Sequence, residues 1–270
     1  MGIIEFSIFV FGCCIGSFLN VVIFRLPLQR SIIYPSSRCL KCNSRISWFD
    51  NIPIFSWLIL KGKCRVCKNK ISSQYPLIES LAGISFLINF YSTPTLFKTV
   101  PEEFVLIMGC ILSSIFILLS VFDYKYFWLP SLLTVSGIFL GLINALIVDF
   151  FIDFNNFIYF QYSLLGSIFG YLIFKSLSVF GEIIFKKPVL GNGDSKLAAM
   201  IGAWLGLKGM LITIWLAFHT AGLFVICGLF LEKLHRKQKI PFGIFLSANA
   251  FLVWTMGNEF FIKTFTFLKY

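Results

Sequence analysis

Long apolar runs separated by short polar segments cover most of the 270-residue chain. A membrane-spanning helix needs about 20 predominantly apolar residues, and eight runs approach or reach that length. The sixth and seventh runs are separated by Gly206-Leu207-Lys208-Gly209, which is typical of a tight turn between two helices. The pattern predicts an all-α polytopic membrane protein with about eight transmembrane helices, near residues 3–24, 76–91, 103–122, 128–148, 158–180, 197–207, 210–231 and 241–257.

The composition agrees with this class and argues against a soluble domain. Hydrophobic residues make up 58% of the chain, charged residues only 13%, and the mean hydropathy is +0.87. The formal net charge of +11 would suit a nucleic-acid-binding protein, but lysine and arginine gather in alternate loops. Ten of them lie between Arg25 and Lys70, and others lie at 186–196 and 233–239. By the positive-inside rule these loops face the cytoplasm, so the lipid bilayer rather than nucleic acid is the expected partner.

Two acidic residues interrupt the apolar pattern at the ends of predicted spans. Asp123 closes the run that ends at Phe122, and Asp194 precedes the run that begins near 197. A charged carboxylate at the bilayer centre costs roughly 2.5 to 3.5 kcal/mol, so such a residue needs a partner, water or a function. Two carboxylates close enough to share one proton can activate water. The sequence therefore suggests a catalytic pair, although Asp123 paired with Lys125 at a helix end remains an alternative.

The residues around Asp194 are candidates for supporting such a site. Gly191 and Gly193 flank it with backbone that can turn sharply and approach a substrate chain closely. Lys196 follows and can orient or balance the charge of the carboxylate. A plain loop turn and an interfacial lysine are the alternative interpretations.

The loop at 27–75 contains two C-x-x-C motifs separated by 21 residues. Four thiolates with this spacing are typical of a structural, tetrahedral zinc site with no open position. A loop of about fifty residues is too small to fold securely on an apolar core, and zinc can supply on the order of 10 kcal/mol of folding free energy. Disulfides, disfavoured in a reduced cytoplasm, and unrelated thiols are the alternatives. The predicted ligands are Cys39, Cys42, Cys64 and Cys67.

Two further polar residues lie inside predicted spans. Asn20 is an unexpected polar side chain in the first span, and an interhelical hydrogen bond is a better explanation for it than a functional role. Glu79 lies just inside the second span, where a salt-bridged rim residue and a functional acid are both consistent with the sequence.

Several motifs together resemble the type IV prepilin leader peptidases, and they occur in that family's order from the first span to the last. The motifs are Gly16-Ser17-Phe18-Leu19-Asn20 through Arg25-Leu26-Pro27, the two C-x-x-C pairs, Asp50-Asn51-Ile52-Pro53, Tyr75-Pro76-x-x-Glu79, Asp123 with Leu129-Pro130, Gly191-x-Gly193-Asp194-x-Lys196 and Pro241-Phe242-Gly243. Two positions depart from the usual pattern. Leu40 replaces a frequent proline and Ser131 a frequent acid, and neither change removes a ligand or catalytic group.

The resemblance implies a bifunctional aspartic endopeptidase in the bacterial inner membrane. It would remove the basic leader from type IV prepilins or type II secretion pseudopilins, after a glycine at the cytoplasmic face, and would methylate the new N-terminus with S-adenosylmethionine. Asp123 and Asp194 would then be catalytic, and the zinc loop, Glu79 and Gly83 would belong to the methyltransferase half. The expected organisation is a first transmembrane helix at 1–26, the zinc loop at 27–75, a second helix at 76–100 and the peptidase domain at 101–270.

Two other functions remain compatible with parts of the pattern. An ion-coupled transporter could use Glu79, Asp123 and Asp194 along an ion path, but the two main acids lie on one rim and no inverted repeat is visible. A membrane scaffold with a zinc loop would leave both acids unexplained.

Overall fold

Helices supply the regular structure of this computed structural model, which describes residues 2–96, 100–152, 156–186, 191–233 and 238–267. In those ranges no strand forms, and the two β-bridges are isolated pairs. The all-α prediction is therefore confirmed. The elements are α1 (Ile3–Arg25), η1 (Leu26–Leu28), η2 (Trp48–Asn51), α2 (Phe55–Ile59), α3 (Gln74–Leu96), α4 (Glu102–Tyr126), α5 (Ser131–Ile152), α6 (Ile158–Phe185), α7 (Asn192–Phe230), α8 (Phe242–Met256) and α9 (Asn258–Phe267).

The chain divides into two compact units, Met1–Tyr91 and Ser92–Tyr270. In the first unit α1 packs closely against α3. A Cβ added to Gly12 would lie 2.8 Å from Gly83 Cα, and one added to Gly16 would lie 2.6 Å from Glu79 Cα. Small residues are what allow two apolar helices to approach at this distance. Gly12, Gly16 and Gly83 form this contact.

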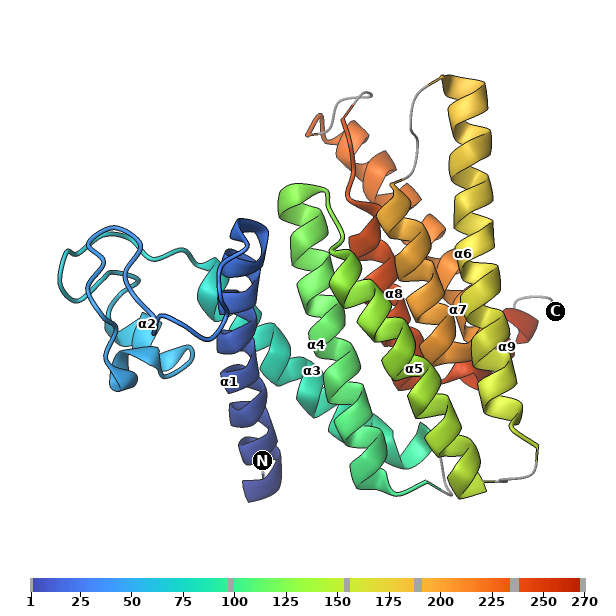
Figure 1. The fold of residues 1–270 in the computed structure, drawn as a ribbon, viewed down its shortest axis with the longest axis horizontal. Coiled ribbons are helices and arrows are strands. Elements are labelled where there is room, and N and C mark those ends of the chain that lie inside the picture. Colours follow the sequence, from blue (N-terminus) through green and yellow to red (C-terminus); the bar gives the residue numbers. More distant parts are fainter. Residues whose placement is uncertain (1, 97–99, 153–155, 187–190, 234–237, 268–270) are drawn as a thin grey trace. The chain divides into compact units, whose positions relative to one another are not determined.

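In the second unit α7 packs against α5, α6 and α8, while α8 also packs against α4 (Figure 1). Their shared core includes Leu112, Leu119, Met200, Ile201 and Leu246, none of which has exposed surface. Because α8 contacts both α4 and α7, it links the helix that ends near Asp123 with the helix that begins near Asp194.

Within the described ranges, five helices are long and apolar enough to cross a membrane, namely α1, α4, α5, α6 and α7, and α8 is a shorter apolar helix. The expected run at 76–91 lies within α3, which carries the buried polar side chains of Glu79, Ser85 and Asn89. The runs at 197–207 and 210–231 both lie on α7, so the eight predicted runs occupy seven helices.

The break between two helices that was expected at Gly206–Gly209 is present, but it is a kink at one residue and not a four-residue turn. Gly206 alone leaves the helical conformation, with φ of 67° and ψ of −178°. A positive φ is accessible to glycine at little cost, so one residue can redirect the helix without a loop. With 39 residues, α7 has a contour length of about 58 Å, far more than a bilayer core of about 30 Å requires. The break at Gly206 divides this length between 192–205 and 207–230.

Candidate active site and metal centre

Asp123 lies at the C-terminal end of α4 and is buried, with 7% of its surface exposed. Its Oδ2 accepts a hydrogen bond of 2.6 Å from the backbone N–H of Gly243, and the N–H of Ile244 donates to the same carboxylate. These N–H groups belong to the first turn of α8, where they have no partner within the helix. The positive end of the helix dipole also favours a negative charge there. Asp123 therefore caps α8 from a distant part of the sequence.

Asp194 occupies the first turn of α7 and is also buried, with 9% exposed. Its Oδ2 accepts a hydrogen bond of 3.2 Å from the N–H of Gly191, while its own N–H donates to the Gly191 carbonyl. This reciprocal arrangement is a capping box built on glycine. Both acids are thus held by backbone donors at the N-terminus of a helix.

The structure brings the segments that carry Asp123 and Asp194 together, because Gly193, next to Asp194, and Gly243, the donor to Asp123, both lie against Leu129. Leu129 lies between their supports. A Cβ added to Gly193 would lie 2.8 Å from Leu129 Cβ, and one added to Gly243 would lie 3.4 Å from Leu129 Cδ1. The pairing of Asp123 with Lys125 is not observed, since the ion pairs among the described residues are Arg65–Asp50 and Lys263–Glu259.

Among the described residues, Lys196 donates its side-chain hydrogen bond to Ser131 Oγ, at 2.8 Å, and not to either carboxylate. This hydrogen bond joins the N-terminal part of α7 to Ser131, the first residue of α5. Ser131 follows Asp123 by eight residues in the sequence. Lys175 of α6 donates to Asn192 Oδ1, at the first residue of α7, at 3.0 Å. Two lysines thus form hydrogen bonds near the N-terminus of α7.

Gly243 was not among the site residues that the sequence suggested, although the motif Pro241-Phe242-Gly243 was noted. A Cβ at this position would lie 2.8 Å from Asp123 Oδ2, so the short hydrogen bond needs glycine. Proline at the start of an apolar run is a helix N-terminus signal. That signal could have indicated free N–H donors, but not which side chain uses them.

The four cysteines at 39, 42, 64 and 67 form one cluster, in which all four sulfurs lie within 4.8 Å of one another. Cys39 Sγ and Cys67 Sγ are 3.8 Å apart. A tetrahedral zinc with Zn–S distances of about 2.3 Å separates its sulfurs by about 3.8 Å, so the cluster fits such an ion. The cluster can hold a metal, and no disulfide joins its thiols.

The two C-x-x-C motifs adopt the same local fold. The N–H of Cys39 donates to the carbonyl of Ser44, and the N–H of Cys64 donates to the carbonyl of Asn69. Asn43 and Lys68, each four residues after the first cysteine of its motif, have positive φ values of 55° and 56°. This repetition points two pairs of sulfurs toward one centre.

Side chains beside the cluster influence its charge and shape. Ser44 Oγ lies 2.9 Å from Cys42 Sγ, and this hydrogen bond lowers the pKa of the Cys42 thiol to about 6, which favours the thiolate that binds metal. Arg65 forms a two-point hydrogen bond with Asp50, at 2.8 and 2.6 Å, and thereby lowers the pKa of Asp50. The second motif is in this way attached to η2.

Glu79 is buried, with 6% exposed, and its Oε2 accepts a hydrogen bond of 2.7 Å from the N–H of Ile54. The hydroxyl of Ser17 also donates to it. Ile54 has a φ of 63°, which is unusual for a β-branched residue and is strained. Glu79 is therefore not a salt-bridged rim residue; it fastens a strained turn of the loop to α3.

Comparisons with known proteins agree with these features. Residues 10–93 match the bacterial peptidase A24 N-terminal domain, and residues 110–256 match the type IV leader peptidase family. The chain is 29% identical over 277 residues to a prepilin leader peptidase/N-methyltransferase of Aeromonas salmonicida, an alignment that covers 93% of this chain and 90% of the relative. It is 33% identical over 259 residues to a type 4 prepilin-like proteins leader peptide-processing enzyme of Escherichia coli, covering 88% and 89%.

A prepilin leader peptidase/N-methyltransferase of Myxococcus xanthus is 38% identical over 210 residues, which cover 76% of this chain and 58% of that relative. No solved structure matches the chain. The matched region of the second family contains Asp123, Asp194 and Gly243, and the first contains the cysteine cluster and Glu79. The chain therefore belongs to the type IV leader peptidase family.

Proposed function

We propose that this chain is a membrane-embedded aspartic endopeptidase in which Asp123 and Asp194 are the catalytic pair. The observation that carries the proposal is the meeting of two buried carboxylates inside the region matched by the family, each fixed by backbone N–H donors of a helix N-terminus. Buried acids are costly, and neither has a cation to pair with among the described residues. A proton shared between them resolves the cost and supplies the chemistry.

In this mechanism one carboxylate removes a proton from water while the other, protonated, donates a hydrogen bond to the scissile carbonyl. The water oxygen adds to the carbonyl carbon, and the bond to the leaving nitrogen then breaks as that nitrogen takes up a proton. Gly243 and Gly191 hold the two side chains in place during these steps. Gly193, which has no side chain, leaves room for Leu129 and for an extended substrate.

The substrate we propose is the precursor of a type IV pilin or type II secretion pseudopilin, cut after a glycine at the cytoplasmic face of the inner membrane. Relatives bear names that specify prepilin leader processing. The basic loops favour a cytoplasmic position for both acids. A glycine before the cut lets the substrate backbone pass close to the carboxylates, whereas a β-branched residue would hold it away.

We also propose that the chain methylates the amine that cleavage creates, with S-adenosylmethionine as the methyl donor. The relatives from Aeromonas and Myxococcus are named as N-methyltransferases as well as peptidases. In this half of the protein Cys39, Cys42, Cys64 and Cys67 would hold one zinc ion. The ion supplies structural cross-linking of the loop, since four thiolates leave no open position for substrate.

The test is incubation of the purified protein with a pilin-type precursor, followed by mass spectrometry of the products. We expect one cut after the glycine, and none with the Asp123→Asn/Asp194→Asn double variant. Replacing the substrate glycine with valine should slow the cut at least about tenfold, or 1.4 kcal/mol. A transporter or a scaffold would leave the precursor intact. Cleavage by the double variant would refute the assignment of the pair.

A further inference from the structure

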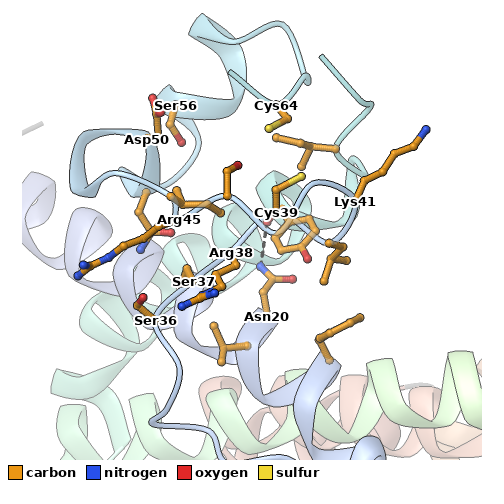
Figure 2. Close-up of a pocket in the computed structure, with 18 of the residues that line it drawn as sticks. Asn20, Ser36, Ser37, Arg38, Cys39, Lys41, Arg45, Asp50, Ser56 and Cys64 are labelled. Atoms are coloured by element: carbon orange, nitrogen blue, oxygen red, sulfur yellow. Dashed lines mark hydrogen bonds between the residues drawn. The ribbon is translucent and has the colours of Figure 1, made fainter. Parts of the chain in front are cut away.

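A second site lies within the Met1–Tyr91 unit, away from the carboxylate pair in sequence and in chemistry. It is a cavity of about 590 Å³ whose walls come from the C-terminal end of α1, both C-x-x-C motifs and the first turn of α3 (Figure 2). Sites for cofactor-sized ligands usually measure about 300 to 1,000 Å³. The cavity is therefore large enough for a nucleoside with an attached amino acid.

One residue of the cavity lining, Asn20, carries an unpaired acceptor. Asn20 is 3% exposed, and its Nδ2 donates to the carbonyls of Gly16 and Tyr75, each at 3.2 Å. Both neighbours of the nitrogen are carbonyl oxygens, which fixes the orientation of the amide. Oδ1 is left buried and without a hydrogen-bond partner among the described residues. Buried polar atoms in folded proteins nearly always have partners, so this oxygen indicates a ligand that brings a donor. Figure 2 shows Asn20 at the end of α1 among the lining residues.

Charges of both signs line the same cavity. Glu79, one helical turn after Tyr75, adds a buried carboxylate near the Asn20 amide. Arg38 and Arg45 also line it, and among the described residues neither forms an ion pair. The other acid, Asp50, is already bonded to Arg65. The cavity thus offers acceptors to a positive group and two guanidinium groups to a negative one.

Aromatic surface completes the lining, since Trp57, Tyr75 and Phe24 contribute to the walls. A flat purine can stack on such rings. A phosphate or an anionic lipid headgroup fits less well, because the Asn20 oxygen and Glu79 would face its negative charge. A molecule with a cationic centre, a carboxylate and an aromatic base satisfies every group named above.

We propose that this cavity binds S-adenosylmethionine, an inference that rests on the methyl-transfer half of the proposed function. Asn20 Oδ1 and Glu79 accept hydrogen bonds from the ammonium group and face the positive sulfonium, while Arg38 and Arg45 bind the carboxylate. In the transfer, the unprotonated amine of the acceptor attacks the methyl carbon. The carbon–sulfur bond breaks with its electron pair going to sulfur, which leaves a protonated methylamine and a neutral thioether.

The role of α1 and α3 follows from this assignment. Asn20 and Glu79 lie on different helices, and Gly12, Gly16 and Gly83 hold those helices in contact. Gly83 belongs to the contact that brings these two helices together.

The experiment measures binding of tritium-labelled S-adenosylmethionine to the purified full-length protein by equilibrium dialysis. Glu79→Gln keeps an oxygen for the N–H of Ile54 and removes the charge, and we expect it to weaken binding at least about tenfold, as should Asn20→Leu. Glu5→Gln is the matched control, because it makes the same change on α1 outside the cavity, and it should bind as the wild type does. Zinc content, measured in each preparation, reports whether the loop is folded.

The outcomes distinguish this site from the proposed function. If the wild type binds the donor and the Glu79→Gln and Asn20→Leu variants bind it equally well, the cavity is not the site, although methyl transfer can still occur. If the wild type cleaves a precursor but binds no donor, both the cavity assignment and the methyltransferase half are wrong while the peptidase half stands. Ultraviolet cross-linking of the labelled donor to a peptide within residues 16–79 would support the assignment independently of activity; a cross-link confined to residues 92–270 would overturn it.

Discussion

In the loop at 27–73, every residue of which is described, Cys64 is the only buried hydrophobic side chain, whereas the helices of the Ser92–Tyr270 unit share a continuous apolar core. The loop instead exposes large apolar residues, among them Ile33 at 80% and Trp48 at 81%. Its order depends on the cysteine cluster, a few backbone turns and the Arg65–Asp50 pair. The bundle depends on helix packing. The two regions should therefore respond to different perturbations, and the two proposed activities should be separable.

The largest effect is expected from variants that remove one carboxylate of the pair in the bundle and leave the loop intact. Asp123→Asn or Asp194→Asn should each slow leader cleavage by at least about 10³-fold, roughly 4 kcal/mol, because an amide cannot share a proton in the pair. Zinc content and donor binding should not change. The measurement is the initial rate of cleavage of a pilin-type precursor.

Asp149 provides the control for those variants. It is a buried acid of the same unit whose carboxylate accepts hydrogen bonds from the N–H groups of Tyr159 and Phe160 at the start of α6. Asp149→Asn should retain cleavage within about threefold if it only caps a helix. Equal losses in all three variants would mean that capping, rather than proton sharing, explains the effect.

The reverse perturbation removes the metal. Cys39→Ser/Cys64→Ser should lower zinc from about one equivalent per chain to less than about a tenth, because two ligands do not hold the ion. The loop should then be digested by trypsin within its basic segment, and methyl transfer should fall at least about tenfold. Leader cleavage should stay within about threefold.

The remaining cysteines serve as the comparison for that variant. Cys110 and Cys227 lie in the second unit, outside the cluster, and replacing both with serine should leave zinc and trypsin resistance unchanged. A metal-free loop that resists trypsin would contradict our account of how this region folds.

A smaller effect tests how tightly the bundle is packed beside the acids. Gly193→Ala places a Cβ 2.8 Å from Leu129 Cβ and should slow cleavage about tenfold by displacing the turn that carries Asp194. Gly222→Ala, on the same helix with nothing within 4 Å, should have no effect on the rate. If both variants cleave equally fast, Leu129 does not position the pair.

The smallest effect concerns Lys196. Its hydrogen bond to Ser131 is exposed, so Lys196→Met and Ser131→Ala should each reduce the cleavage rate only about two- to threefold, and the double variant no further. The comparison of the three rates is a double-mutant cycle. Additive losses would show that Lys196 acts on the carboxylates or the substrate instead of through Ser131.

Much of the fold is local and could be predicted from the sequence. Apolar runs of sufficient length specify helices, and each C-x-x-C spacing specifies one pair of thiolates, because both depend on neighbouring residues. The bond between Asp123 and Gly243 could not be predicted in this way, since it joins positions 120 residues apart. The unpaired oxygen of Asn20 could not be predicted either, because the sequence shows a polar side chain but not which of its atoms lacks a hydrogen-bond partner.

The continuation of α7 through Gly206 has a similar explanation. Glycines at 206 and 209 and a lysine between them favour a turn when only the sequence is considered. In the structure, α6 packs so closely on α7 that a Cβ on Gly166 would lie 2.7 Å from the Gly206 carbonyl carbon. Packing against a neighbouring helix thus keeps both arms helical on either side of one non-helical residue.

The cap that Asp123 provides for α8 also determines when the site can form during synthesis of the chain. The acid is synthesised 120 residues before its hydrogen-bond donor. At a translation rate of roughly 5 to 20 residues per second, the ribosome needs roughly 6 to 24 s to cover that interval. Throughout it α8 does not exist, and the Asp123 carboxylate cannot adopt the conformation that we propose for hydrolysis. A nascent chain therefore cannot hydrolyse a precursor by the proposed mechanism until its last apolar segments have entered the membrane.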